Sequence, residues 1–440
     1  QQTAGSQNLI GGGSSNTFAD GSNSTIVGGS GNQHTNGTYN LIGGGSSNTI
    51  SAGSNSTIVG GTGNQQTAGT QNLIGGGTSN TVTAGTNSSI IGGTGNQQTA
   101  GSQNLVGGGS SNTIANGTNS SILGGTGNQH TTGTQNLIGG GSSNTVAAGT
   151  NSTIVGGTGN QHTAGSQNLV GGGSSNTVAD GTNSSIIGGS GNTHTAGSQN
   201  LIGGGSSNTI TNGTYSTVLG GQSNTHTGGT HNLIGGGQTN TITAGTHNAV
   251  VSGQTNLISA GSQNAITGGE DNTISSGNKG AITGGQGNII SSGNNNVILG
   301  GETNTITAGN RNAILGGESN TISSGNYNSV LGGKDNTVSG GYSYAIGNGN
   351  TAGANAFAMG DGATAVANEF SALYSAGFKV TSEGTANDGY IATFINPANA
   401  NGISIQIGTP ESANANDFVT FKDQSGTMVG RIEGQTIPEL

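Results

Sequence analysis

Five histidines recur at one fixed position of a repeating sequence, and imidazoles in a regular row could bind a metal ion or respond to pH. The row continues with glutamine at two positions, and its members are His34, Gln66, Gln98, His130, His162, His194 and His226. If 16 residues form one coil of stacked strands, the closest members lie two coils, or about 10 Å, apart, too far to share a metal ion. We therefore expect a buried polar row without a metal, in which burial lowers the histidine pKa.

Asparagines form a second row, with one member in every 16-residue repeat. An exposed row of amides could bind a glycan or another surface, whereas stacked amides inside a fold bond to the strands above and below. We favour the second interpretation. It predicts a structural ladder that includes Asn16, Asn48, Asn80, Asn112, Asn144, Asn176, Asn208 and Asn240.

Pairs of threonines flank an apolar residue in segments 81–83, 209–211, 241–243 and 305–307, which is similar to the rows of ice-binding solenoids. Glutamine interrupts the pattern in alternate coils, so ice binding is an alternative hypothesis. Catalytic chemistry finds no support, because the chain has no cysteine, no Gly-x-x-x-x-Gly-Lys loop and no Ser/His/Asp set in a supporting context. The sequence predicts no enzyme, no cofactor and no metal site.

A strict period of 16 residues must position all of these side chains. Glycine opens 21 units between Gly5 and Gly341, and the asparagine of the ladder is the twelfth residue of each unit. Such a period predicts a solenoid. Each unit contains two half-units of eight residues, each a short strand and a tight turn in which glycine supplies a positive φ. We therefore predict an all-β parallel β-roll of 21 coils with two strands per coil, spaced about 4.8 Å apart.

Positions within a unit are called places, with place one at the opening glycine. Places six and fourteen carry the β-branched and apolar residues and should meet inside the roll, so places five and seven point outward from the first strand. Apolar residues alternate between these two outward places, giving about one per coil. A lone roll would expose this row, so we predict a side-by-side homotrimer whose axis is lined by Leu41, Val59, Leu73, Ile91, Leu105 and Leu123.

Charge is concentrated late in the sequence. Between residues 1 and 269 only Asp20 and Asp180 carry a formal charge, so most of the net charge of −10 belongs to the C-terminal part. No basic patch attracts nucleic acid or an anionic membrane, and no apolar run is long enough to cross a bilayer. The sequence therefore predicts neither nucleic-acid binding nor membrane insertion by this segment.

The repeat changes character along the chain. Residues 1–340 form the rod, in which 1–228 read as 32-residue doublets of unlike coils and 229–340 as simple 16-residue units. From 341 to 376 the period shortens, with spacings of 13 and 14 between segments that begin at Tyr344, Phe357 and Ser371. Residues 377–440 read as a small β-rich domain with five alternating strands, the last two joined by a hairpin turn at 424–426.

Residues 344–365 read Tyr-Ala-Ile-Gly-Asn-Gly-Asn-Thr-Ala-Gly-Ala-Asn-Ala-Phe-Ala-Met-Gly-Asp-Gly-Ala-Thr-Ala. This segment resembles the head repeats of YadA-like trimeric autotransporter adhesins. The similarity is closest over about 341–373 and looser over 5–340, where the coils are longer. The resemblance implies a left-handed parallel β-roll, three chains packed side by side, and a head that binds host or surface ligands.

Together these features predict an extracellular fibrous protein of a cell surface or a virion-like appendage. Its rod would present repeated faces for attachment to a surface, a glycan or a protein ligand, and its first partner would be a second copy of itself. Three alternatives remain: a phage or injection-system tail fibre, a filament subunit that joins end to end through exposed strand edges, and an ice-binding solenoid.

Overall fold

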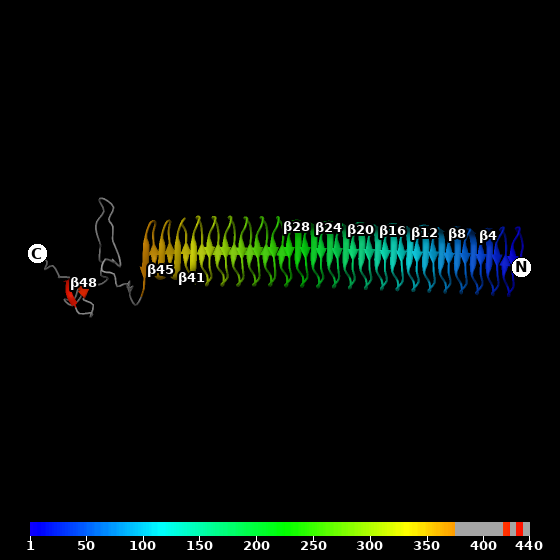
Figure 1. Cartoon of the computed structure of the whole chain (residues 1–440), viewed down its shortest axis with the longest axis horizontal. Helices are drawn as coiled ribbons and strands as arrows, with labels where there is room; N and C mark the ends of the chain where they lie inside the picture. Colours follow the sequence, from blue (N-terminus) through cyan, green and yellow to red (C-terminus); the bar gives the residue numbers. More distant parts are fainter. Residues whose placement is uncertain (375–416, 423–427, 434–440) are drawn as a thin grey trace, which may run out of the picture. The chain divides into compact units, whose positions relative to one another are not determined.

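The computed structural model describes residues 1–374, 417–422 and 428–433. The described part of the chain contains strands and turns and no helix. Contacts divide the chain into two compact units, residues 1–376 and 377–440. In the first unit, coils stack in sequence order along one axis (Figure 1) and build a 24-stranded parallel sheet and a second sheet of 23 strands. The predicted fold class, an all-β parallel solenoid with 16-residue coils, is confirmed.

Odd-numbered strands form the first sheet, called here the odd sheet. It begins at β1 (Leu9–Ile10) and repeats once per coil through β39 (Ala313–Ile314), each strand covering places five and six. Longer strands follow, namely β41 (Ser329–Lys334), β43 (Tyr344–Asn348), β45 (Phe357–Asp361) and β47 (Phe370–Leu373).

Even-numbered strands form the second sheet, called the even sheet. After β2 (Thr17–Phe18) it has one six-residue strand per coil, from β4 (Gln33–Thr38) through β28 (Thr225–Thr230). Two-residue strands then run from β30 (Thr241–Ile242) through β42 (Thr337–Val338) at the same period, followed by β44 (Thr351–Ala352) and β46 (Thr364–Ala365). The change from long to short strands falls where the sequence changes from doublets to simple units.

The core is a narrow seam between the two sheets. Places six and fourteen face each other there, and residues such as Ile26, Ile42 and Ile50 are buried. Parallel pairing keeps equal places in register, so Ile42 lies beside Ile58 and one apolar row extends from coil to coil. Because β-branched residues suit a pleated strand and pack closely on its surface, the repeated Ile and Val stabilise both the strand and the core.

The doublet has a steric explanation that the sequence alone did not reveal. Coils with a histidine at place fourteen carry the small Ser at place four, and the next coil carries Asn there; Ser120, His130 and Asn136 are one such set. Glycine at place one of the same coil makes room for the ring, since a Cβ on Gly117 would lie 2.7 Å from the imidazole Nδ1 of His130. Large and small residues thus alternate with a period of two coils.

Replacing Gly149 by alanine should therefore destabilise the solenoid by about 1–3 kcal/mol, because overpacking forces a rigid ring or the backbone to move. The added Cβ would lie 2.6 Å from Cε1 of His162. Gly140→Ala is the matched control, because no atom lies within 4 Å of a Cβ at that position. Chemical denaturation of both variants checks the prediction, and equal midpoints would contradict it.

The coils after residue 341 depart from the prediction in one detail. Tyr344 pairs with Phe357, and Phe357 pairs with Phe370, so the two coils are equal in length. The predicted second spacing, longer by one residue than the first, was wrong because it aligned Ser371 with Phe357. Phe357 and Phe370 also contact edge to face, with ring centroids 5.3 Å apart.

The second unit is described only in part. Strands β48 (Asp417–Lys422) and β49 (Met428–Glu433) pair antiparallel and correspond to the last two of the five predicted strands. The predicted turn at 424–426 and the other three strands lie outside the described residues.

Candidate functional surfaces

The twelfth-place asparagines lie inside the solenoid and bond to the next coil. Asn112 is fully buried; its Nδ2 donates to the carbonyl oxygens of Gly108 at 2.9 Å and Gly125 at 3.0 Å. Its Oδ1 accepts the backbone N–H of Asn128 at 3.0 Å. The same arrangement recurs from Asn16 to Asn240 in every member of the predicted ladder. The hydrogen-bonding atoms of these amides are paired with backbone groups inside the solenoid and are not accessible to a ligand.

A second internal ladder at place four was missed in the sequence. Asn104 Oδ1 accepts the backbone N–H of Ser120, and Ser120 Oγ in turn accepts the N–H of Asn136 at 3.2 Å. Asparagine and serine alternate at this place through residue 228, and each coil with a histidine at place fourteen carries the serine. The recurrence of Asn or Ser at place four, with Gly280 as the exception, was the signal that could have found it.

The histidine row is buried, as each ring of the five is at most 2 % exposed. In His130, Nε2 lies 3.0 Å from the amide Nδ2 of Asn136, whose Oδ1 is taken by the N–H of Ser152. The amide must donate, so Nε2 accepts and the proton of the neutral ring is on Nδ1. That Nδ1 has no partner among the described residues, and the same is true in His34, His162, His194 and His226.

This environment favours the neutral imidazole. Burial lowers the pKa of His130, His162, His194 and His226 to about 4, and it also lowers the pKa of His34. The physical causes are loss of hydration and an N–H donor that faces Nε2, the atom that protonation would convert to a donor. Gln66 and Gln98 occupy the same place with both amide atoms unpartnered among the described residues.

The outer face of the odd sheet carries an exposed apolar row, called here the apolar stripe. Through residue 228 its members are the apolar residues at place seven: Val27, Val59, Ile91, Leu123, Val155, Ile187 and Leu219. They are 50–54 % exposed and alternate with glycine in neighbouring coils. Leu41 beside them is 37 % exposed, and Leu73 and Leu105 are half-buried. The six predicted axis residues therefore lie on one face of the solenoid.

The two turn edges that flank this face differ in charge from residue 262 onward. Places two and three form the basic edge, with Lys279 and Arg311, and places ten and eleven form the acidic edge. The acidic edge carries Glu270, Asp271, Glu302, Glu318 and Asp335. Its Lys334 is paired with Glu318 at 2.8 Å, the one ion pair among the described residues. Aromatic rings also stack on the basic edge, where His231 lies between Tyr215 and His247 with centroids 4.9 and 4.8 Å away.

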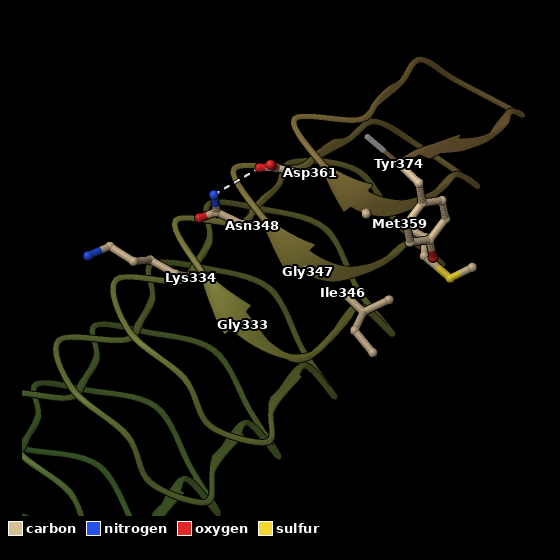
Figure 2. A pocket seen from close by; sticks show the side chains of 9 residues that line it. Gly333, Lys334, Ile346, Gly347, Asn348, Met359, Asp361 and Tyr374 are labelled. Carbon is tan, nitrogen blue, oxygen red and sulfur yellow. Dashed lines mark hydrogen bonds between the residues drawn. The ribbon is translucent and has the colours of Figure 1, made fainter. Parts of the chain in front are cut away.

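A recess of about 610 Å³ lies over β41, β43 and β45 (Figure 2). Figure 2 shows Ile346, Met359 and Tyr374 on one side of the recess, and on the other a polar row of Lys334, Asn348 and Asp361, the last residues of the three strands. Asn348 Nδ2 donates to Asp361 at 2.9 Å.

Across residues 1–374, 417–422 and 428–433, no three histidine, aspartate or glutamate side chains gather closely enough to hold a metal ion. The same residues include no helix of the length and apolarity that crossing a membrane requires. No protein-family model matches the sequence, and a search of curated proteins gives no match.

Proposed function

We propose that this protein is an extracellular fibre segment whose solenoid packs side by side with further copies, as a homotrimer, and presents repeated faces for surface attachment. The apolar stripe carries this proposal. A row of half-exposed apolar side chains along one face is typical of an interaction site, because soluble monomers rarely expose large apolar patches. Covering the half-exposed side chains stabilises an assembly by about 1 kcal/mol for each residue buried.

The shape of the stripe favours a second copy as its occupant. Raised residues such as Val59 and Ile91 alternate with glycines such as Gly75 at place seven. Projections and hollows therefore repeat every two coils, or about 10 Å, and an identical chain offers the same period. The mechanism is passive: stacked strands give stiffness, the number of coils sets the reach, and repeated faces allow multivalent contacts. The chain is proposed to act by binding and not by catalysis.

The absolute mass of the folded protein in solution tests this proposal. Light scattering on a size-exclusion column should give about three times the chain mass of 42.2 kDa. The double variant Ile91→Asp/Leu123→Asp should shift the mass toward that of a single chain, because two charges per copy would be buried in an apolar contact. Thr83→Asp/Thr99→Asp, at exposed positions of the even sheet, is the control and should leave the mass unchanged. A single-chain mass for the wild type would overturn the trimer and favour the filament and ice-binding alternatives.

A further inference from the structure

Each cation of the basic edge lies in a hollow. A cavity of about 420 Å³ is lined by Lys279 with Gln263 and Asn278, and an adjoining cavity of about 320 Å³ is lined by Arg311 with Asn310 and others. The two cavities share Asn294 and Asn295 and so form one continuous trough along the edge. Such a concave site with converging polar groups is suited to receive anionic side chains.

The trough presents N–H donors and cations that can bind an anionic group. Its wall is a ladder of exposed amides in which Asn278 Nδ2 donates to Asn294 Oδ1 at 3.0 Å, and Asn294 bonds to Asn310 in the same way. The second N–H of each amide has no partner among the described residues. The ring of Tyr327 holds the guanidinium of Arg311, with the central carbon 5.1 Å from the ring centroid. Within the described residues neither Lys279 nor Arg311 is paired with a carboxylate.

The acidic edge has the same spacing as the two cations. Glu270 and Glu302 occupy the same place two coils apart, as do Lys279 and Arg311, so each pair spans about 10 Å. Along the chain, Glu270 precedes Lys279 and Glu302 precedes Arg311, each by little more than half of one 16-residue coil. Glu270 and Lys279 therefore differ in height along the solenoid axis by less than the ~4.8 Å spacing of coils.

Cyclic symmetry turns this match into a contact between copies. In a ring of parallel chains that face the axis with the odd sheet, the acidic edge of one copy meets the basic edge of the next. A pure rotation adds no shift along the axis, so the glutamates of one copy stand at the height of the cations of its neighbour. This geometry depends on the self-association proposed above.

We propose that Glu270 and Glu302 of each copy enter the hollows of Lys279 and Arg311 of the next copy, and that these contacts set the axial register of the assembly. Register needs such a device because the doublet coils before residue 228 repeat every two coils. A slip of one doublet restores most of the apolar contacts of those coils, but it keeps only one of the two glutamate–cation pairs and leaves the other glutamate and the other cation about 10 Å from their partners. Charge complementarity mainly supplies specificity, because misplaced charges are repelled or left unpaired.

An anionic polymer such as a carboxylated polysaccharide is the other occupant that the trough could take. The second copy is favoured because the net charge of −10 repels a polyanion. The matched two-coil spacings also have a direct counterpart in another copy of the chain.

Cross-linking reads the register directly, because the natural chain has no cysteine. The double variant Glu270→Cys/Lys279→Cys should give covalent trimers with a short bismaleimide, since the two positions lie on opposite edges of one copy but face each other between copies, at a backbone distance too long for a direct disulfide. Glu270→Cys/Arg311→Cys is the slipped control, two coils out of register, and should remain uncross-linked. Cross-linking of the slipped pair, or of neither pair in an assembly of trimer mass, overturns the inference.

Charge reversal supplies an independent readout. Lys279→Glu/Arg311→Glu should raise the concentration of half-dissociation about tenfold or more, and adding Glu270→Lys/Glu302→Arg in the same chain should restore it, because both edges are then exchanged. A single-chain mass for the wild type would defeat the proposed self-association itself. A trimer mass that none of these changes alters would defeat only the register proposal. Binding of polygalacturonate that the first double variant abolishes without a change in mass would assign the trough to a free polyanion and also overturn the proposal.

Discussion

Replacing Asn112 by alanine is expected to lower the free energy of unfolding by about 3 kcal/mol or more, because a buried polar group left unsatisfied costs about 1–3 kcal/mol. The amide makes three hydrogen bonds, and its loss leaves the carbonyl oxygens of Gly108 and Gly125 and the N–H of Asn128 without partners. The small volume left by the side chain adds to this loss, because neighbouring strands are held apart by their own ladders and cannot collapse onto it.

The same coil provides the control. Asn116 is a little further along the chain, lies at an exposed position of β14 (Thr113–Thr118), and makes no side-chain hydrogen bond among the described residues. Asn116→Ala should change stability by less than about 0.5 kcal/mol. Urea denaturation followed by circular dichroism compares the two. If Asn112→Ala unfolds at the same midpoint as Asn116→Ala, the ladder is not the stabilising element described here.

Stability should fall steeply between pH 6.5 and pH 4. An unfolded histidine has a pKa near 6.5, whereas burial lowers the pKa to about 4 in His130, His162, His194 and His226. Above pH 6.5 both states are neutral and the rings cause no pH dependence. Below pH 6.5 the histidines of the unfolded chain bind protons, whereas the buried histidines of the folded chain stay neutral. The free energy of unfolding therefore decreases as the pH falls toward 4. At pH 5 the loss is about 2 kcal/mol for each histidine.

Thermal melts at pH 8 and pH 5 measure this effect. A variant with all four of these histidines replaced by glutamine should show a much flatter profile, and the fold accommodates glutamine at this place in Gln66 and Gln98. An unchanged melting temperature from pH 8 to pH 5 in the wild type would contradict the burial of the neutral rings.

The main features of the solenoid could be predicted from the sequence because one period controls the whole rod. The period defines the coil, and the alternation of side chains within a strand assigns Ile42 to the interior and Val59 to the exterior. The interior position of the Asn112 and His130 rows follows in the same way, since equal places stack directly on one another. No long-range pairing had to be inferred beyond the repeat itself.

What remained hidden depends on contacts between unequal places. That Ser120 leaves room for His130, and that Asn136 then bonds to its ring, requires knowing how places four and fourteen approach across the core. The positions of Lys279 and Glu270 on opposite edges likewise depend on how the turns bend. The sequences around the two residues are similarly rich in glycine and do not show on which edge each turn lies. Phe370 was misaligned by one residue, since the shortened coils lose the period that fixes register elsewhere.

The stacking of each coil on its two neighbours alone also determines how the rod responds to tension. Force along the chain loads the terminal coil first, because no contact reaches beyond the adjacent coil to share the load. Coils then peel away one at a time, and each releases 16 residues, or about 50 Å of extended chain. A solenoid built in this way lengthens in equal steps at a nearly constant force.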